Sequence, residues 1–117
     1  MTVTEAAANI RGTVVAGAAS AAAIEVRGGY ASDLLSDTMG NAREGDLWVT
    51  MQKHLNIVAV AHLKGLAGIV VVNGRRPEDA AVAKAEEEHI TIISTELPAF
   101  DVIGILYSQG IRGRRSA

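Results

Sequence analysis

Residues 46–74, DLWVTMQKHLNIVAVAHLKGLAGIVVVNG, decide which fold this sequence can adopt. The stretch opens and closes with short apolar runs, DLWVTMQ (46–52) and GIVVVNG (68–74), which are rich in β-branched residues and pass into small or polar ones. Roughly twenty residues separate the starts of these runs, the interval that a strand–helix–strand crossover between parallel strands occupies. We therefore predict parallel strands over 46–52 and 68–74.

The segment between these strands, NIVAVAHLKGLA (56–67), is predicted to form the crossover helix. Its β-branched residues alone would also permit a strand, but a strand there would leave no room for the connection between two parallel strands. A third apolar run, ITIISTE (90–96), follows at a similar interval. Strands as uniformly apolar as these three are typical of parallel sheets that are buried on both faces.

Two further helices are predicted after the crossover unit. In RPEDAAVAKAEEEH (76–89), Pro77 suits the first helical turn, and the carboxylates of Glu78 and Asp79 complement the positive end of the helix dipole. The segment PAFDVIGILYSQ (98–109) also starts with a proline and is predicted to be the closing helix.

The first third of the chain predicts one helix and two short strands. Thr2 and Glu5 match a capping box, which starts a helix that runs to about Ile10. TVVAG (13–17) is rich in β-branched residues and AIEVRG (23–28) alternates between apolar and polar residues, so both are predicted strands. The AASAAA between them fits either a loop or a helical turn.

A helix is also expected between the second predicted strand and residue 46. Ser32 can cap a helix that starts at Asp33. The apolar face of this helix would consist of Leu34, Leu35 and Met39.

Taken together, these elements predict a single α/β domain over residues 1–111. We expect a layered α/β/α arrangement with a mainly parallel sheet of about five strands. A chain of 117 residues that is 49% hydrophobic can bury one core of this size but not two. The basic tail RGRRSA (112–117) is predicted to be flexible.

Composition and charge exclude several classes of function. The net charge is −2 and only 3% of residues are aromatic, so the chain lacks the basic surface and the stacking side chains that nucleic-acid binding requires. Cysteine is absent, which excludes thiol catalysis and suits a reducing cytoplasm, where we expect the protein. The Ala-rich segment 12–26 has no basic region before it, as a signal peptide would, and is too short to span a membrane.

Small or polar residues follow the three apolar strands, at the edge where parallel strands end together. They are Thr50, Gln52, Asn73, Gly74, Ser94 and Thr95. Ligands of open parallel sheets bind at this edge, where the following helices also offer free backbone amides to a phosphate or carboxylate. The alternative is that these residues only terminate strands and cap helices.

Four further residues extend the predicted ligand site. His54 follows the first core strand, and Arg75, together with the adjacent Arg76, could either clamp an anion or only occupy a loop. Gly29 and Ser32 could contact a ligand, although glycines in this position also simply allow tight packing of the backbone. The candidate binding residues are therefore Gly29, Ser32, Thr50, Gln52, His54, Asn73, Gly74, Arg75, Ser94 and Thr95.

No catalytic or metal site can be assembled from the sequence, and we predict that the protein is not an enzyme. His54, His62 and His89 lack a metal-binding spacing, no P-loop motif is present, and Ser94 lacks a G-x-S-x-G motif. An enzyme that uses His54 or Ser94 would need a nucleophile–base pair, which the sequence does not offer. The cofactor is unknown. Trp48 is expected in the core, or alternatively in a subunit contact.

Several blocks of the sequence carry a family resemblance. GDLWVT (45–50), NIVAVAHLKGLAGIVVVNGRRP (56–77) and ITIISTELPAFD (90–101) resemble the blocks of the DRTGG domain family. GGYASDLLSD (28–37) is similar to small stand-alone members. The resemblance covers nearly the whole chain and implies a layered α/β fold similar to the N-terminal domain of HPr kinase/phosphorylase.

This resemblance implies a role in sensing or assembly. Family members include regulatory modules beside CBS domains in some pyrophosphatases and in certain phosphate acetyltransferases, without independent catalysis. Some stand-alone relatives are encoded near iron-hydrogenase and redox-complex genes, which implies an accessory role. The Asp-Arg pair of the motif would fall near QKH (52–54), and VNG (72–74) replaces its Thr-Gly-Gly, so only Gly74 carries over.

Two functions follow as hypotheses. The first is a non-catalytic regulatory or accessory domain, forming a cytoplasmic homodimer, that binds a small anionic, nucleotide-like ligand at the C-terminal edge of the strands. The alternative is a protein-interaction or dimerisation subunit of a redox or hydrogenase-associated assembly, without a small-molecule ligand. In that case Trp48 or the Ala-rich segment would face a partner. We expect neither nucleic acid nor membrane as a partner.

Overall fold

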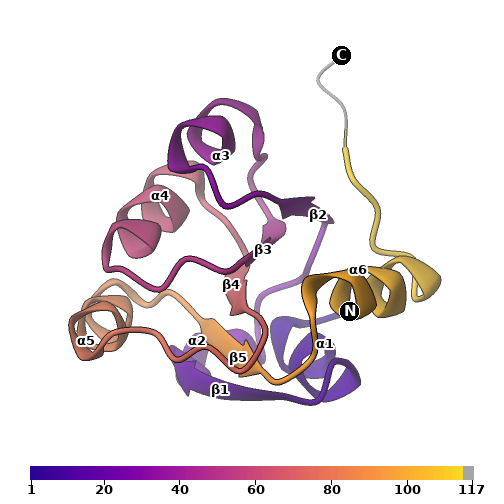
Figure 1. Ribbon diagram of the computed structural model, residues 1–117, viewed down its shortest axis with the longest axis horizontal. Helices are drawn as coiled ribbons and strands as arrows, with labels where there is room; N and C mark the ends of the chain where they lie inside the picture. The colour runs from indigo at the N-terminus through magenta and orange to yellow at the C-terminus, as the bar shows by residue number, and fades with distance from the viewer. Residues whose placement is uncertain (115–117) are drawn as a thin grey trace.

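The computed structural model describes residues 1–114, and within them five strands form one sheet in the order β1-β5-β4-β3-β2 (Figure 1). Strands β2 to β5 run parallel, and β1 pairs with β5 in the antiparallel direction. The strands are Gly12–Ala16 (β1), Gly28–Ala31 (β2), Asp46–Thr50 (β3), Gly68–Val71 (β4) and Ile92–Thr95 (β5). The predicted sheet of mainly parallel strands is confirmed.

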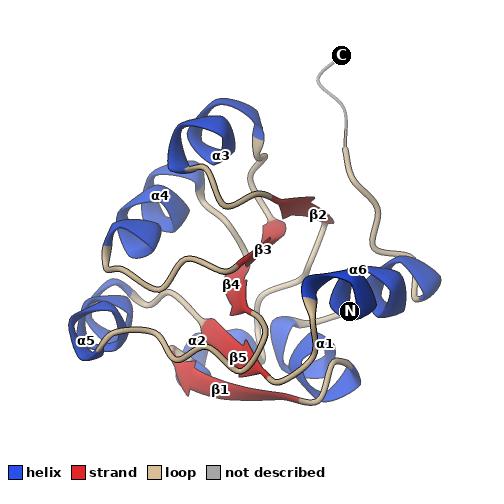
Figure 2. Ribbon diagram, viewed as in Figure 1, coloured by secondary structure: helices blue, strands red, loops and turns tan. Residues whose placement is uncertain are grey.

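Helices cover both faces of this sheet, as Figure 2 shows. Helices α3, α4 and α5 lie on one side, α1 and α6 lie on the other, and the short α2 follows β1. The helices are Val3–Asn9 (α1), Ala18–Ala21 (α2), Leu35–Asn41 (α3), Asn56–Lys64 (α4), Asp79–Glu88 (α5) and Ala99–Ser108 (α6). The layered α/β/α fold is therefore confirmed. In the range 1–114, none of these helices has the length and apolar character needed to cross a membrane.

The alternation of side chains along β3 shows why the central strands are so uniformly apolar. Leu47 and Val49 pack into the core under α1 and α6, whereas Trp48 packs with Ile57 of α4 on the opposite face. Because helices cover both faces of the sheet, every residue of β3 is buried. Trp48 is fully buried, so the alternative that it protrudes into a subunit contact is wrong.

The crossover unit forms as predicted. Strands β3 and β4 lie side by side, with Leu47 opposite Gly68 and Trp48 opposite Ile69. Helix α4 connects them and ends at Gly65, whose φ of 63° lies in the left-handed region that a residue without a Cβ adopts most easily. The predicted capping box of α1, a strand close to the predicted 13–17 (β1) and the two later helices α5 and α6 are also present.

The second strand lies later in the chain than predicted. Strand β2 occupies Gly28–Ala31 and pairs with β3, so the prediction of a strand over 23–28 is wrong. The alternating residues before β2 instead contact the N-terminus. The amide of Val3 donates to the carbonyl of Ile24, and the amide of Val26 donates to the carbonyl of Met1. The alternation of apolar and polar residues cannot distinguish a strand of the sheet from a segment bonded to the N-terminus, because tertiary packing determines the pairing partner.

Helix α3 also begins later than the predicted Asp33. The Oγ of Ser32 accepts a hydrogen bond from the amide of Leu34 (3.1 Å) before the helix starts. The predicted apolar face is confirmed only for Leu35, which packs against the core; it is wrong for Leu34 and Met39, which are 64% and 38% exposed, while Thr38 is buried. The carboxylate of Asp33 is bonded to the end of β3, which holds this residue outside the helix.

After α6 the chain returns to the free edge of β2. The carbonyl of Arg112 accepts a hydrogen bond from the amide of Gly29 (3.0 Å), and Nη2 of Arg114 lies 2.5 Å from Oδ1 of the buried Asp46. A Cβ on Gly28 would lie only 2.6 Å from Nε of Arg114, so the glycine allows this close approach. The end of the predicted flexible tail, 115–117, lies outside the described residues.

Candidate functional site

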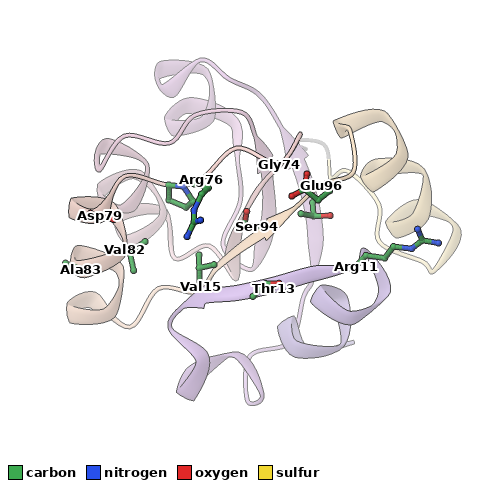
Figure 3. Close-up of a pocket in the computed structure, with 12 residues that line it drawn as sticks. Arg11, Thr13, Val15, Gly74, Arg76, Asp79, Val82, Ala83, Ser94 and Glu96 are labelled. Atoms are coloured by element: carbon green, nitrogen blue, oxygen red, sulfur yellow. The ribbon is translucent and has the colours of Figure 1, made fainter.

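A cavity of about 670 Å³ opens at the C-terminal end of β5 (Figure 3). Its walls come from the start of β1, the end of β5, the loop between β4 and α5, and the first turns of α5. Residues with polar groups on this wall include Arg11, Thr13, Gly74, Arg76, Ser94 and Glu96. Three of the ten predicted binding residues line the cavity, namely Gly74, Ser94 and Thr95.

The antiparallel pairing of β1 with β5 creates one wall of this cavity. Thr13 lies opposite Ser94 in the register, so both side chains project from the same face of the sheet. Arg11 precedes β1 and has a positive φ of 54°, which turns the chain from α1 into the strand. The start of β1 is thereby placed beside the end of β5, where the predicted site lies.

Two arginines and two carboxylates determine the charge around the cavity. Figure 3 shows Arg76 extending from the β4–α5 loop toward Val15 of β1, whereas Arg11 extends away from these residues toward α6. Asp79, at the start of α5, and Glu96, after β5, provide the negative charges. All four charged side chains are exposed, and none has an ion-pair or side-chain hydrogen-bond partner among residues 1–114.

The two hydroxyls at the end of β5 already make hydrogen bonds within the protein. Oγ1 of the buried Thr95 donates to the carbonyl of Ile10 (2.8 Å) and accepts from the amide of Leu97 (3.2 Å). Oγ of Ser94 donates to the carbonyl of Arg75 (3.1 Å). Thr95 therefore connects α1 to β5, while the half-buried Ser94 oxygen can still accept a hydrogen bond from a ligand.

Asn73 and Gly74 form a tight turn after β4. Their φ angles are 62° and 66°, and the amide of Arg75 donates to the carbonyl of Val72, a combination typical of a type I′ turn. The amide of Gly74 also donates to the carbonyl of Thr95, which fixes the turn against β5. The turn directs the following loop over the cavity, although Asn73 and Arg75 themselves are not part of its wall.

Three other predicted residues meet at a second place, at the ends of β2 and β3. Thr50 Oγ1 and the amide of Met51 both donate to Oδ1 of Asp33, at 3.0 and 2.6 Å. Nε2 of Gln52 donates to the carbonyl of Asp33 (2.8 Å), and Nε1 of Trp48 donates to the carbonyl of Ser32 (2.9 Å). Ser32, Thr50 and Gln52 are therefore brought together, but by hydrogen bonds that join two loops of the protein.

The remaining two predicted residues lie apart from the cavity. His54 is exposed, and its Nδ1 accepts a hydrogen bond from the amide of Asn56 at the start of α4 (3.2 Å). Gly29 lies in the edge strand β2, where its amide is bonded to Arg112. The ten predicted residues thus fall in several places along the C-terminal side of the sheet and at its edge.

Sequence reasoning found only one of the four charged residues of the cavity. Arg76 was considered together with Arg75 as a possible anion clamp, and the structure places only Arg76 of the two in the cavity wall. Arg11 and Thr13 carried no signal in the sequence, because they reach the site only through the long-range pairing of β1 with β5. Glu96 is the last residue of the predicted strand segment 90–96 and lies one residue beyond the end of β5 at Thr95, a position where exposed carboxylates are common.

The acidic residues of the 28–37 segment belong to separate hydrogen-bond networks. The phenol of Tyr30 donates to Oδ2 of Asp37 (2.7 Å). This hydrogen bond raises the pKa of the Tyr30 phenol and lowers the pKa of the Asp37 carboxyl. Asp33 instead accepts hydrogen bonds from Thr50 and Met51 at the end of β3. Across residues 1–114, no group of histidines and carboxylates could hold a metal ion.

Comparison with known proteins identifies a related fold. No protein-family model matches the sequence, and no curated protein matches it significantly. Among solved structures, the chain is similar to the CBS and DRTGG domains of the regulatory region of Clostridium perfringens pyrophosphatase, complexed with its activator diadenosine tetraphosphate. The TM-score is 0.68 at 12% sequence identity, and the match covers 90% of this chain.

This similarity concerns the fold. The chain matches 45% of the pyrophosphatase regulatory region, so it spans less than half of that structure. The TM-score supports a layered α/β architecture, which is the architecture that the DRTGG resemblance implied. At 12% identity, the similarity shows the fold alone. Membership of the DRTGG family itself stays a prediction.

Proposed function

We propose that the protein is a non-catalytic regulatory or accessory domain that binds a small, anionic, nucleotide-like ligand in the cavity at the end of β5. The observation that carries this proposal is the guanidinium of Arg76, which has no side-chain partner within residues 1–114 and lines the same cavity as Ser94, beside the C-terminal end of β5. Ligands of open α/β sheets bind at this edge. A volume of about 670 Å³ also lies within the range of small-molecule sites.

The mixed charge of the cavity favours a ligand that carries both a phosphate and hydroxyl groups. The guanidinium of Arg76 and the positive end of the dipole of α5, which begins at Asp79, suit a phosphate. The exposed carboxylates of Asp79 and Glu96 suit hydroxyl donors such as those of a ribose. A simple inorganic anion would leave these carboxylates without partners and would be repelled by them.

The related structure supports a regulatory role for this protein, but does not identify its ligand. The pyrophosphatase region that shares this fold is regulatory, and it was solved with the nucleotide activator diadenosine tetraphosphate. Within residues 1–114, the hydroxyl of Ser94 donates to a backbone carbonyl and His54 accepts from the amide of Asn56, so these two side chains do not act on one another. We infer that ligand binding, rather than turnover, is the function of this cavity.

Arg76→Ala is expected to weaken nucleotide binding roughly ten- to hundred-fold, because a hydrogen bond to a charged group contributes about 1.5–3 kcal/mol. The measurement is the shift of the thermal unfolding midpoint, and the dissociation constant by calorimetry, with ATP, AMP, diadenosine tetraphosphate and inorganic phosphate as probes. A probe at one hundred times its dissociation constant stabilises the native state by about 2.7 kcal/mol.

Arg75→Ala is the matched control, because Arg75 is the adjacent exposed arginine and does not line the cavity. Both variants remove the same charge from the same loop, so a general loss of positive charge would affect them equally. Equal weakening by the two substitutions, or no stabilisation of the wild type by any of the four probes, would contradict the proposal.

The alternative function is a protein-interaction or dimerisation subunit of a redox or hydrogenase-associated assembly without a small-molecule ligand. The observation that favours it is the exposed apolar surface of α6, where Phe100 is 89% exposed. Purification from the native host distinguishes the two functions. A stoichiometric partner protein, together with no response to nucleotides, would support the alternative.

A further inference from the structure

Helix α6 exposes an apolar surface that the protein's own core does not use. Phe100 is 89% exposed, Ile103 is 40% exposed and Tyr107 is 55% exposed. They are three and four positions apart in the sequence, so they lie along one side of the helix. Val102 and Leu106, on the other side of α6, are buried against the sheet. Contiguous exposed apolar side chains of this size are typical of an interaction surface.

A hollow lies directly beside this apolar surface. Its volume is about 480 Å³, and Phe100, Gly104 and Ile105 of α6 contribute to its wall. Gly104 lies inside the helix, where glycine is unfavourable by about 1 kcal/mol relative to alanine. A Cβ on Gly104 would have no neighbour within 4 Å, so the fold of the single chain does not require a glycine there.

Opposite charges line the same hollow. Arg11 and Asp101 both contribute to its wall, and Figure 3 shows the side chain of Arg11 extending toward α6. Both side chains are exposed, and neither has an ion-pair or hydrogen-bond partner within the described residues 1–114. The hollow therefore presents one unpaired cation and one unpaired anion next to an exposed aromatic ring.

We propose that this surface is the twofold interface of a homodimer, in which α6 of one copy packs against α6 of a second copy. Phe100 of each copy fills the hollow over Gly104 of the other, and Arg11 of each copy pairs with Asp101 of the other. In a twofold interface every contact is made twice, so the surface must be complementary to itself. A protruding ring and a hollow, and a cation and an anion, on the same surface meet this requirement.

The size of the surface also suits a second copy. A stable interface buries roughly 800 Å² per partner, and a buried aromatic side chain contributes about 150–250 Å². Phe100 and Ile103 provide the apolar centre, and Tyr107, whose ring contacts the guanidinium of Arg112 (3.8 Å), lies at its margin. Met51, which is 38% exposed, shares a smaller hollow with Ala99 at the start of α6. The inference is independent of the ligand proposed above.

Charge reversal tests the pairing of Arg11 with Asp101. The chain mass is 12.2 kDa, and we expect the wild type to sediment with twice this mass at micromolar concentration. Arg11→Asp alone and Asp101→Arg alone should each be monomeric, because each homodimer would contain two like-charge contacts. An equimolar mixture of the two variants should form a heterodimer, because both contacts are then again between opposite charges.

Substitution of the ring tests the apolar centre. Phe100→Ala should raise the dissociation constant of the dimer at least ten-fold, as the loss of an aromatic interface anchor does. Leu63→Ala is the matched control, because Leu63 is 70% exposed on α4, on the other side of the sheet. Recovery of the dimer in the mixture of charge variants also shows that those chains are folded.

Three outcomes would overturn the inference. The first is a wild type that stays monomeric up to millimolar concentration. The second is a dimer that Phe100→Ala and Leu63→Ala weaken equally. The third is a mixture of the two charge variants that is no more dimeric than each variant alone. All of these measurements are made without any added nucleotide, so they do not depend on whether the cavity binds a ligand.

Discussion

Trp48→Ala is expected to reduce the free energy of unfolding by about 3–5 kcal/mol, the largest loss we expect from a single substitution in this chain. The indole is fully buried between β3 and α4, and Nε1 donates to the carbonyl of Ser32 (2.9 Å). The substitution removes the ring from the core, leaves a cavity there and deprives the Ser32 carbonyl of its donor. Urea unfolding followed by circular dichroism measures the loss.

Trp48→Phe separates the contribution of the ring from that of the hydrogen bond. Phenylalanine retains most of the buried aromatic area but cannot donate to Ser32, so we expect a loss of about 1–3 kcal/mol. Because the chain contains one tryptophan, a red shift of its fluorescence on unfolding of the wild type checks that the indole is buried. Equal losses for the two variants, or a loss below 1 kcal/mol for alanine, would be inconsistent with this position in the core.

Arg114→Ala is expected to destabilise the protein by about 3 kcal/mol, although the residue lies close to the C-terminus. Nε and Nη2 of Arg114 both contact Oδ1 of Asp46, whose side chain is only 2% exposed. Removal of the guanidinium leaves a buried carboxylate with the amide of Arg43 as its remaining hydrogen-bond donor, at 2.8 Å. Breaking one side of a buried pair typically reduces stability by about 3–5 kcal/mol. The 29% exposure of Arg114 places our expectation at the lower end.

A double-mutant cycle isolates this interaction. Arg114→Ala, Asp46→Ala and the double variant are unfolded in urea, and the coupling energy is obtained from the three losses. We expect the double variant to be more stable than Arg114→Ala alone, because no unpaired carboxylate is then buried. Additive losses would show that the tail does not pair with Asp46 in solution.

The tail contact also explains why the segment 28–50 was only partly predictable. Two glycines in succession indicated a turn or a tightly packed backbone, and the structure uses Gly28 and Gly29 as a strand that the returning tail can approach closely. A strand with glycines at its start has a weak local signal. The neighbour that makes these glycines useful lies at the opposite end of the sequence.

The candidate site was predictable in its location but less so in its composition. Ser94, Thr95 and Gly74 follow apolar strands, and the parallel arrangement does place them at one edge. Thr50 and Gln52 follow the same rule, yet hydrogen bonds to Asp33 hold them in another loop contact. Small and polar residues in the sequence indicated where the strands end. The hydrogen-bond partners of these residues depend on which loops lie next to one another in the folded protein.

The sequence by itself determined the parallel centre of this protein. Strands β3, β4 and β5, and the helices between them, are encoded by local features: apolar β-branched runs, a spacing that admits a crossover helix, and glycine and proline at helix ends. These features act within a few residues along the chain, and the connectivity then leaves little choice of topology.

Only the tertiary structure decided what lies at the two edges of that centre. The pairing of β1 with β5 brought Arg11 and Thr13 to the cavity, and the return of the tail to β2 brought Arg114 to Asp46. Pairing between distant segments depends on packing and hydrogen bonding that no local periodicity records. The composition of the cavity and of the α6 surface follows from these long-range contacts.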